Sequence, residues 1–191
     1  NMLSAPSREH LFGTDNLGRD LFSRCVYGAR YSLSLGIICM LLALVSGGLL
    51  GLIASYFGGA TDNIIMRIMD VFQAIPGTLM AITVIAALGK GVPQLLLALA
   101  LSSLPIFSKT VRAAIFTVRE SEYIESSRAL GAGNARLMFR HMLPNALGHI
   151  IIYAVGMISG SIMLIATLSY IGLGIQPPTP EWGALLNAGK S

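Results

Sequence analysis

Four long apolar stretches, separated by short polar interruptions, dominate the chain. They cover about residues 33–57, 70–88, 92–112 and 144–172. The first has no formal charge over about 25 residues, which gives roughly 37 Å of helix and is enough to cross a hydrocarbon core about 30 Å thick. The pattern predicts an all-α integral membrane protein with four membrane-spanning helices.

The first 30 residues are polar and rich in turn-forming residues. A helix is expected from about Arg19, with apolar residues on one face, as in a helix that lies at the membrane interface. Residues 1–30 are therefore predicted to form a segment outside the membrane with an interfacial helix. The stretch from Asp15 to Asp20 lacks the alternating oxygen ligands and the distal Glu of a calcium loop.

Two pairs of glycines are spaced four residues apart within the apolar stretches. Gly47 and Gly51 lie in the first stretch, and Gly156 and Gly160 lie in the fourth. Glycine at this spacing lets the backbone of another helix approach closely. Both pairs are therefore candidates for helix–helix contacts.

The second and third stretches contain residues that are unusual in a plain membrane helix. Pro76-Gly77 is predicted to kink or locally unwind the second span, and Arg67 and Asp70 are spaced to pair on one helix face. A translocation path is one use of such residues, although proline kinks are common and serine hydroxyls often bond to their own helix. The candidate pathway residues are Gln73, Pro76, Ser102, Ser103 and Pro105.

A charged interval, residues 119–145, interrupts the apolar pattern. Within it, Tyr123, Ile124, Ser127 and Leu130 fall at helical spacing and predict a short amphipathic helix over about residues 121–130. Gly131 would end this helix. Asn134 would cap a second short helix, and Pro144 would begin the last apolar helix. An ordinary solvated loop is the alternative interpretation.

Composition supports a membrane protein and argues against several other classes. Hydrophobic residues make up 54% of the chain and charged residues 12%, far from the balance of a soluble domain. The net charge of +4 comes without interleaved aromatic residues, so nucleic-acid binding gains no support. Cys25 and Cys39 lack metal or redox spacing, and we expect no metal site and no cofactor.

The sequence contains no catalytic motif. The terminal Gly189-Lys190-Ser191 imitates the end of a phosphate-binding loop, but the preceding glycine is at the wrong distance and no strand is expected before it. We therefore expect a protein that is not an enzyme, and any uphill transport would need an external source of energy. Lys and Arg are almost equally divided between the two predicted membrane faces, so the positive-inside rule does not orient the chain.

The charged interval resembles the EAA signature of permease subunits of ATP-binding-cassette (ABC) importers. The resemblance rests on Glu125-Ser126-Ser127, on Gly131 four residues later, and on Leu143-Pro144. Ser126 and Ser127 replace the two alanines of the signature, and His141 stands where the family often has Ile. These departures leave the spacing intact.

Further motifs along the chain look like the dipeptide, oligopeptide and nickel branch of these importers, and within it the second type of permease subunit. Those motifs are residues 10–20, 56–59, 66–70 and 172–183. The resemblance implies the transmembrane domain of a type I ABC importer over residues 31–191. Such subunits usually have six spans, so four are expected here, with one span before Asn1 and one after Ser191.

The resemblance also implies a mechanism. The helix at about residues 121–130 would be a coupling helix inserted into a cytoplasmic ATPase subunit, within a cytoplasmic coupling loop at 119–143. Glu125 would pair at that joint, apolar side chains would supply contacts, and Gly131 would turn the chain back. The implied ATPase-coupling residues are Tyr123, Ile124, Glu125, Ser126, Ser127, Leu130, Gly131, Leu143 and Pro144.

The implied partners are a second permease subunit, ATP-binding subunits that hydrolyse ATP, an extracytoplasmic substrate-binding protein and the lipid bilayer of a bacterial inner membrane. Residues 1–30 and 175–191 would face outward. Di- and oligopeptides are the expected substrates because they are the commonest in this branch; nickel, glutathione and other small solutes are alternatives. A non-transporting membrane scaffold is the alternative from a different class, and a membrane enzyme is a third.

Overall fold

The computed structural model describes residues 2–190, and this part of the chain is mainly α-helical, with a single isolated β-bridge between Thr14 and Asp20. Three helical segments in it are long and apolar enough to cross a membrane, and a bent pair of helices forms a fourth candidate span. The helices are α1 (Leu21–Phe57), α2 (Gly59–Ala74), α3 (Gly77–Leu88), α4 (Val92–Arg119), α5 (Glu122–Ala129), α6 (Asn134–Arg136), a π-helical turn (Leu137–Met142), α7 (Leu143–Tyr170) and α8 (Trp182–Ala188).

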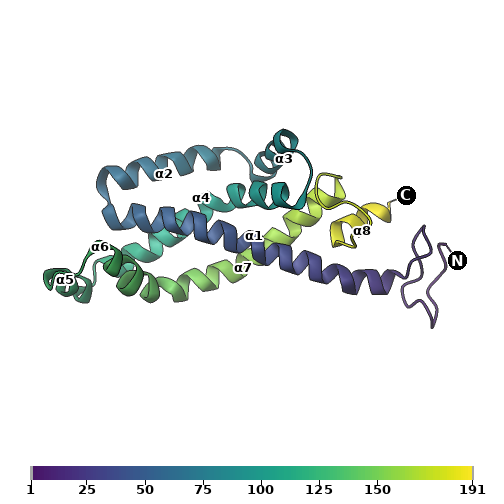
Figure 1. The fold of residues 1–191 in the computed structure, drawn as a ribbon, viewed down its shortest axis with the longest axis horizontal. Helices are drawn as coiled ribbons and strands as arrows, with labels where there is room; N and C mark the ends of the chain where they lie inside the picture. Colours follow the sequence, from purple (N-terminus) through teal and green to yellow (C-terminus); the bar gives the residue numbers. More distant parts are fainter. Residues whose placement is uncertain (1, 191) are drawn as a thin grey trace.

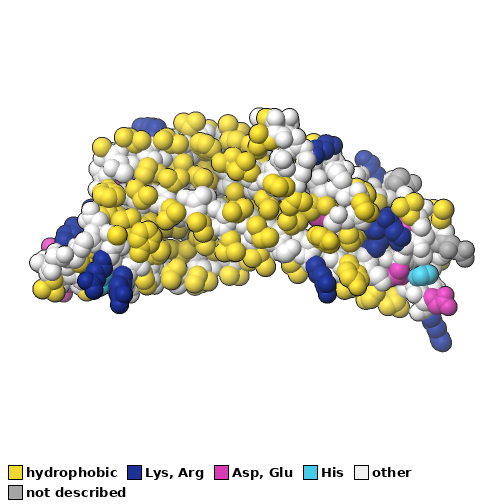
Figure 2. All heavy atoms as spheres, in the orientation of Figure 1, with side chains coloured by type: hydrophobic (Ala, Val, Ile, Leu, Met, Phe, Trp, Pro, Cys, Tyr) yellow, Lys and Arg dark blue, Asp and Glu magenta, His cyan; other side chains and the backbone are white. Residues whose placement is uncertain are grey.

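Helices α1, α4 and α7 pack along one another and form the body of an elongated bundle (Figure 1). Helices α5 and α6 lie at one end, which we call the α5 end. The N-terminal segment and α8 lie at the other, which we call the terminal end. Hydrophobic side chains cover the middle of the visible face, and most Lys and Arg side chains lie towards the two ends (Figure 2). This distribution suits a multi-pass membrane protein.

Helix α1 is longer than the sequence predicted. An interfacial helix from about Arg19 and a separate span at residues 33–57 were expected, but one unbroken helix of 37 residues begins at Leu21. Asp20 caps it by accepting a hydrogen bond from the backbone N–H of Ser23 at 2.7 Å. No proline interrupts residues 21–57, and the Arg24 side chain turns towards Asp15 at 3.7 Å instead of ending the helix.

The second apolar stretch is bent far more sharply than a kinked span. Helix α2 already begins at Gly59, and α2 and α3 meet at 86°. Pro76 lacks a backbone N–H and disfavours helical geometry in the residue before it, and Ile75 is extended at φ −90° and ψ 125°. The break predicted at Pro76-Gly77 is confirmed, and the predicted span at residues 70–88 stays a prediction, because α2 and α3 together form one broken candidate span. Arg67 and Asp70 share α2 and interact electrostatically, but the ion pair of Asp70 is with Lys109 of α4.

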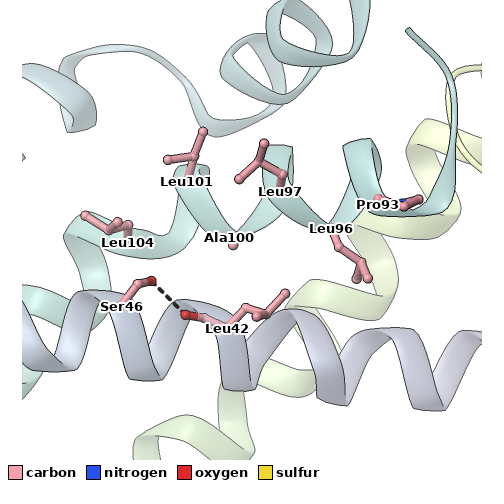
Figure 3. Close-up of a pocket in the computed structure, with 8 residues that line it drawn as sticks. All are labelled: Leu42, Ser46, Pro93, Leu96, Leu97, Ala100, Leu101 and Leu104. Atoms are coloured by element: carbon pink, nitrogen blue, oxygen red, sulfur yellow. Dashed lines mark hydrogen bonds between the residues drawn. The ribbon is translucent and has the colours of Figure 1, made fainter. Parts of the chain in front are cut away.

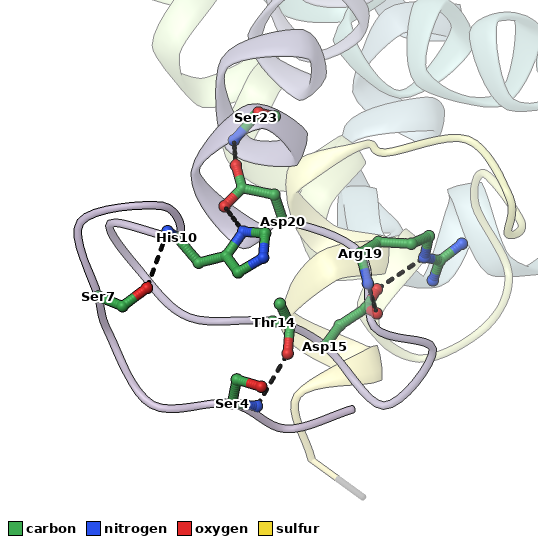
Figure 4. Close-up of polar contacts among 8 residues, drawn as sticks. All are labelled: Ser4, Ser7, His10, Thr14, Asp15, Arg19, Asp20 and Ser23. Atoms are coloured by element: carbon green, nitrogen blue, oxygen red, sulfur yellow. Dashed lines mark hydrogen bonds and ion pairs between the residues drawn. The ribbon is translucent and has the colours of Figure 1, made fainter. Parts of the chain in front are cut away.

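The N-terminal segment is an ordered turn structure held by its aspartates (Figure 4). The Asp15 carboxylate accepts hydrogen bonds from the backbone N–H groups of Leu17 and Arg19, both at 2.9 Å, and from Arg19 Nε at 2.7 Å. His10 Nδ1 lies 3.1 Å from Asp20 Oδ1. These contacts fold the segment back onto the start of α1.

Candidate coupling site

Helix α5 connects α4 to the helix that leads into α7, and it projects at the α5 end of the bundle (Figure 1). It spans Glu122–Ala129, close to the predicted residues 121–130. Glu122 and Glu125 lie in its first turn and Arg128 in its last. Negative charge near the N-terminus and positive charge near the C-terminus interact favourably with the helix dipole. They stabilise a helix that is too short to persist alone.

Ile124 anchors α5 to the bundle. Its side chain is 1% exposed and packs in a cluster with Tyr56, Leu137 and Met142. Ile124 was predicted to offer an apolar contact to a partner; in this chain its side chain faces inward, and that contact stays a prediction. An eight-residue helix has little stability of its own, so its one buried residue is needed to hold it.

The outward side of α5 carries apolar residues. Leu130 is 89% exposed and Tyr123 is 41% exposed. Glu125 and Ser126 are exposed beside them. A nearly bare leucine at a helix end is an ordinary contact residue for a partner protein, and isolated cases also occur on free surfaces.

Gly131 makes the turn after α5 possible. Its φ is +83°, in the left-handed region that suits glycine, and a Cβ atom added there would have no other atom within 4 Å. Its N–H donates to the carbonyl of Arg128 at 2.9 Å, and the N–H of Ala132 donates to the carbonyl of Ser127 at 3.1 Å. Gly133 has an ordinary φ of −69°, so the two glycines have different roles.

Three contacts that the sequence did not indicate tie the site to α1. Arg119 Nη1 donates to the carbonyl of Ser55 at 2.7 Å, and Tyr56 Oη donates to Asn134 Oδ1 at 2.7 Å. The Arg128 guanidinium lies 5.8 Å from the centre of the Tyr56 ring. Asn134 was expected to cap a helix, but Gly133 occupies that position and the Asn134 side chain bonds Tyr56 instead.

Leu143 begins α7 and Pro144 lies in its first turn, but α7 follows the preceding helical turns without a break. Residues 134–170 run as one long helical segment through the π-helical turn Leu137–Met142. The turn widens the helix just before Pro144, which lacks a backbone N–H to donate. Asn145 Nδ2 donates to the carbonyl of His141 at 2.6 Å. Residues 134–142 are therefore continuous with α7.

The candidate pathway residues differ in their exposure and in their hydrogen bonds. Gln73 accepts a hydrogen bond from Lys109 Nζ, and Ser102 Oγ donates to the carbonyls of Gly77 (3.0 Å) and Ala98 (2.8 Å). Pro76 is exposed at the α2–α3 bend, and Ser103 is half-buried in α4. Pro105 is buried inside α4, and its place on a path stays a prediction.

A cavity between α1 and α4 is almost wholly apolar. It is lined by leucines with Ser46 and Pro93, and the Ser46 hydroxyl bonds the carbonyl of Leu42 in its own helix at 2.7 Å (Figure 3). Within residues 2–190, no group of three or more His, Cys, Asp or Glu side chains is arranged to hold a metal ion.

A multi-pass helical bundle with a short helix projecting at one end is the architecture of ABC importer transmembrane domains. One structure of the MetNI methionine ABC transporter in an inward-facing conformation matches with a TM-score of 0.71 at 19% identity, over 81% of this chain and 77% of that one. A crystal structure of an amino acid ABC transporter with histidines matches with a TM-score of 0.62 at 15% identity, over 88% and 78%. At these identities the likeness shows the fold alone.

Residues 47–190 match the family described as binding-protein-dependent transport system inner membrane component, and the chain belongs to this family of transport proteins. It is 45% identical to a glutathione transport system permease protein, GsiD, of Pectobacterium atrosepticum, over 97% of this chain and 62% of the relative. It is also 45% identical to a dipeptide transport system permease protein, DppC, of Alkalihalophilus pseudofirmus, over 98% and 62%. The chain thus spans about three fifths of the length of these relatives.

Proposed function

We propose that the chain is part of a permease subunit of an ATP-driven importer in a bacterial inner membrane. With a second permease subunit it forms a path for small peptides, and α5 receives movement from a cytoplasmic ATPase subunit. The α5 end then faces the cytoplasm. The terminal end, with residues 2–30 and 175–190, faces an extracytoplasmic binding protein.

The exposure of Leu130 at the tip of the α5 region carries this proposal. Its 89% exposure beside Tyr123 and Glu125 presents an apolar anchor with a charged neighbour, which suits a groove on another protein. Burial of Ile124 and the contact of Arg128 with the Tyr56 ring hold the other side of α5 to the bundle. Force on Leu130 is therefore transmitted to α1 and, through the continuous segment 134–170, to α7.

Small peptides are the proposed substrate class. The relatives that support this are named for glutathione and dipeptide transport, and glutathione is itself a tripeptide. The ligand carried by the binding protein that co-purifies with the complex identifies the substrate. A nickel ion or a solute without a peptide bond there would contradict this assignment and leave the importer proposal intact.

The coupling role is tested by two matched glycine substitutions in the full-length protein. Gly131→Ala places a side chain at φ +83°, whereas Gly133→Ala does so at φ −69° in open space. We expect Gly131→Ala to reduce uptake about tenfold or more and to weaken co-purification of the ATPase, because α5 is misplaced. Gly133→Ala is expected to behave as wild type.

Glu125→Gln tests the charge at the same joint. It removes the carboxylate and keeps the shape of the side chain, so loss of uptake with normal membrane insertion supports a paired charge across the interface. Wild-type uptake and ATPase retention in both Gly131→Ala and Glu125→Gln would reject the coupling role. Reconstituted vesicles that show no ATP-dependent uptake would instead favour a membrane scaffold.

A further inference from the structure

The groove between α2 and α4 is polar, unlike the apolar surfaces around it. It encloses a cavity of about 480 Å³ between one face of α2 and adjacent turns of α4. Its polar lining side chains are Asp62, Asn63, Arg67, Asp70, Lys109 and Arg112. Six polar side chains in one groove of a membrane bundle require polar partners, since buried or lipid-facing charge is costly.

Both carboxylates in the groove already have a cation from α4. Arg112 Nε and Nη2 donate to the two oxygens of Asp62, each at 2.5 Å. Lys109 Nζ donates to Asp70 Oδ1 at 2.7 Å, and it also donates to Gln73. The two pairs join α2 to α4 and fix the positions of the groups between them.

Arg67 is the cation left over. Its side chain is exposed, and among residues 2–190 it forms no ion pair with a carboxylate. The groove therefore carries one more positive than negative group, with three cations against two carboxylates. The charge of Arg67 acts on Asp70 of the same helix, but its guanidinium donates to neither carboxylate. A guanidinium with free donors that lines one groove with an ammonium group is a fitting site for an oxyanion such as a carboxylate or a phosphate.

The groove reaches into the bundle from the α1–α2 turn. Asp62 lies in the first turn of α2, and Asp70 lies eight residues further on, about 12 Å along the helix. The Asp70 side chain is 54% exposed and the Lys109 side chain 39% exposed. Groups this exposed need water or a polar ligand beside them, because lipid tails cannot solvate them.

Arg67 and Asp70 lie three residues apart on α2, so their side chains project from the same face about 5–6 Å apart at Cβ. A cation that forms no ion pair thus stands beside a half-exposed carboxylate, on which its charge acts without a direct bond. We propose that the α2–α4 groove binds a small zwitterion, with its oxyanion on Arg67 and Lys109 and its ammonium group on Asp70. Gln73 acts as a positioning residue by holding Lys109.

Two sources supply this chemistry: the charged ends of a short peptide and the headgroup of phosphatidylethanolamine. The zwitterion site itself is independent of the proposed function. Its assignment to a transported solute rests on that function, whereas occupancy by a headgroup does not.

Binding is measured by native mass spectrometry on the full-length permease complex, without ATP and without uptake. The probes are alanyl-alanine, its N-acetylated amide and phosphatidylethanolamine. We expect one zwitterion to be retained and the uncharged amide to be lost. Retention of alanyl-alanine identifies a solute site, and retention of the lipid identifies a headgroup site.

Three variants make the result specific. Arg67→Gln removes the free cation, and Asn63→Asp cancels the surplus charge without altering any cation. Both are expected to weaken retention about tenfold, as for loss of one charge-assisted hydrogen bond. Arg30→Gln removes an exposed arginine at the terminal half of α1 and is expected to change nothing.

The proposal is overturned if neither zwitterion is retained, if the amide binds equally well, or if Arg67→Gln and Asn63→Asp both bind as wild type does. Because no step uses α5 or ATP, failure of the coupling experiments leaves this result unaffected. If coupling is normal and no zwitterion is retained, the proposed groove site is rejected and the coupling role stands.

Discussion

Two glycine pairs with the same spacing have opposite surroundings in this bundle. A Cβ atom at Gly51 of α1 would lie 2.2 Å from the carbonyl oxygen of Ser108, and one at Gly47 would lie 2.6 Å from that of Leu104. At Gly156 and Gly160 of α7, no atom lies within 4 Å of the same position. The motif permits close approach of a helix, and in the described chain only α1 has a helix that uses it.

The difference extends along both helices. About 44% of the apolar window of α1 is buried, against 22% for the segment that contains α7. α1 packs against α4 through its middle and is held at both ends, by the α5 region at one end and by α8 at the other. One wide face of α7 is not covered by any other part of residues 2–190.

The largest effect is expected from Gly51→Ala. The new methyl group would meet the backbone of α4, which cannot rotate away as a side chain can, so we expect a loss of about 2–3 kcal/mol in the free energy of unfolding. Gly160→Ala, in open space, is expected to change stability by less than about 0.5 kcal/mol. Thermal unfolding of the purified full-length protein measures both. Equal effects in the two variants would refute the comparison.

A smaller effect is expected where α8 holds the terminal end of α1. The Glu181 side chain is 0% exposed, and it accepts hydrogen bonds from Ala184 N–H at 3.0 Å and from Ser32 Oγ at 3.3 Å. Glu181→Ala removes a helix cap and a buried acceptor, and we expect a loss of about 2 kcal/mol. Glu181→Gln keeps an acceptor and should lose less. Faster hydrogen exchange of the α8 amides, with the α5 amides unchanged, would locate the effect.

At the opposite end of α1, Tyr56→Phe removes one hydrogen bond and little else. Tyr56 is 6% exposed, and its hydroxyl bonds Asn134. We expect a loss of about 1 kcal/mol, together with faster exchange in the segment after Gly133. Asn134→Ala alone and combined with Tyr56→Phe completes a double-mutant cycle. A coupling energy near zero would show that this contact does not hold the α5 region to α1.

The smallest effect concerns pH at the N-terminal segment. Burial acts to raise the pKa of Asp15, but hydrogen bonds from the backbone and side chain of Arg19 and from Leu17 outweigh it, so the pKa lies below its ordinary value of 3.8. The stabilisation is therefore complete above about pH 4 and is lost as pH falls through the lowered pKa. After correction for intrinsic rates, we expect the amide exchange rates of residues 13–20 to stay constant between pH 5 and 8. Below pH 4 we expect these rates to rise. Asp15→Asn should abolish the acid step, and an acid step that persists in this variant would contradict the assignment.

Much of the fold was predictable because apolar length and breaking residues act locally. The apolar stretches locate membrane helices, Pro76-Gly77 locates a break, and Gly131 locates the turn after α5. The predicted helix boundaries differ from the structure where contacts or geometry outside the local pattern decide where a helix begins. The predicted interfacial helix and the first span form one helix, α1, in which Arg24 faces Asp15 of the N-terminal segment. Helix α7 follows the π-helical turn Leu137–Met142 without a break, with Pro144 in its first turn.

The same limit applies to the candidate sites. Spacing on a helix identified Tyr123, Leu130 and Gly131, but it did not distinguish Ile124, which faces inward, from residues that face outward. Pro105 and Gln73 look equally suited to a path in the sequence, yet one is buried and the other bonds Lys109. Arg67 and Asp70 are close in sequence, but the ion pair of Asp70 comes from a residue 39 positions away.

By itself, the sequence determined that this chain is a helical membrane protein with a short charged helix between its last two long apolar segments, because hydrophobic length, glycine and proline act within a few residues. Only the tertiary structure decided which glycine pair packs against a helix, which face of α5 is free, and how the charges of α2 and α4 pair. Those outcomes depend on contacts between residues far apart in sequence, whose free energy no local pattern contains.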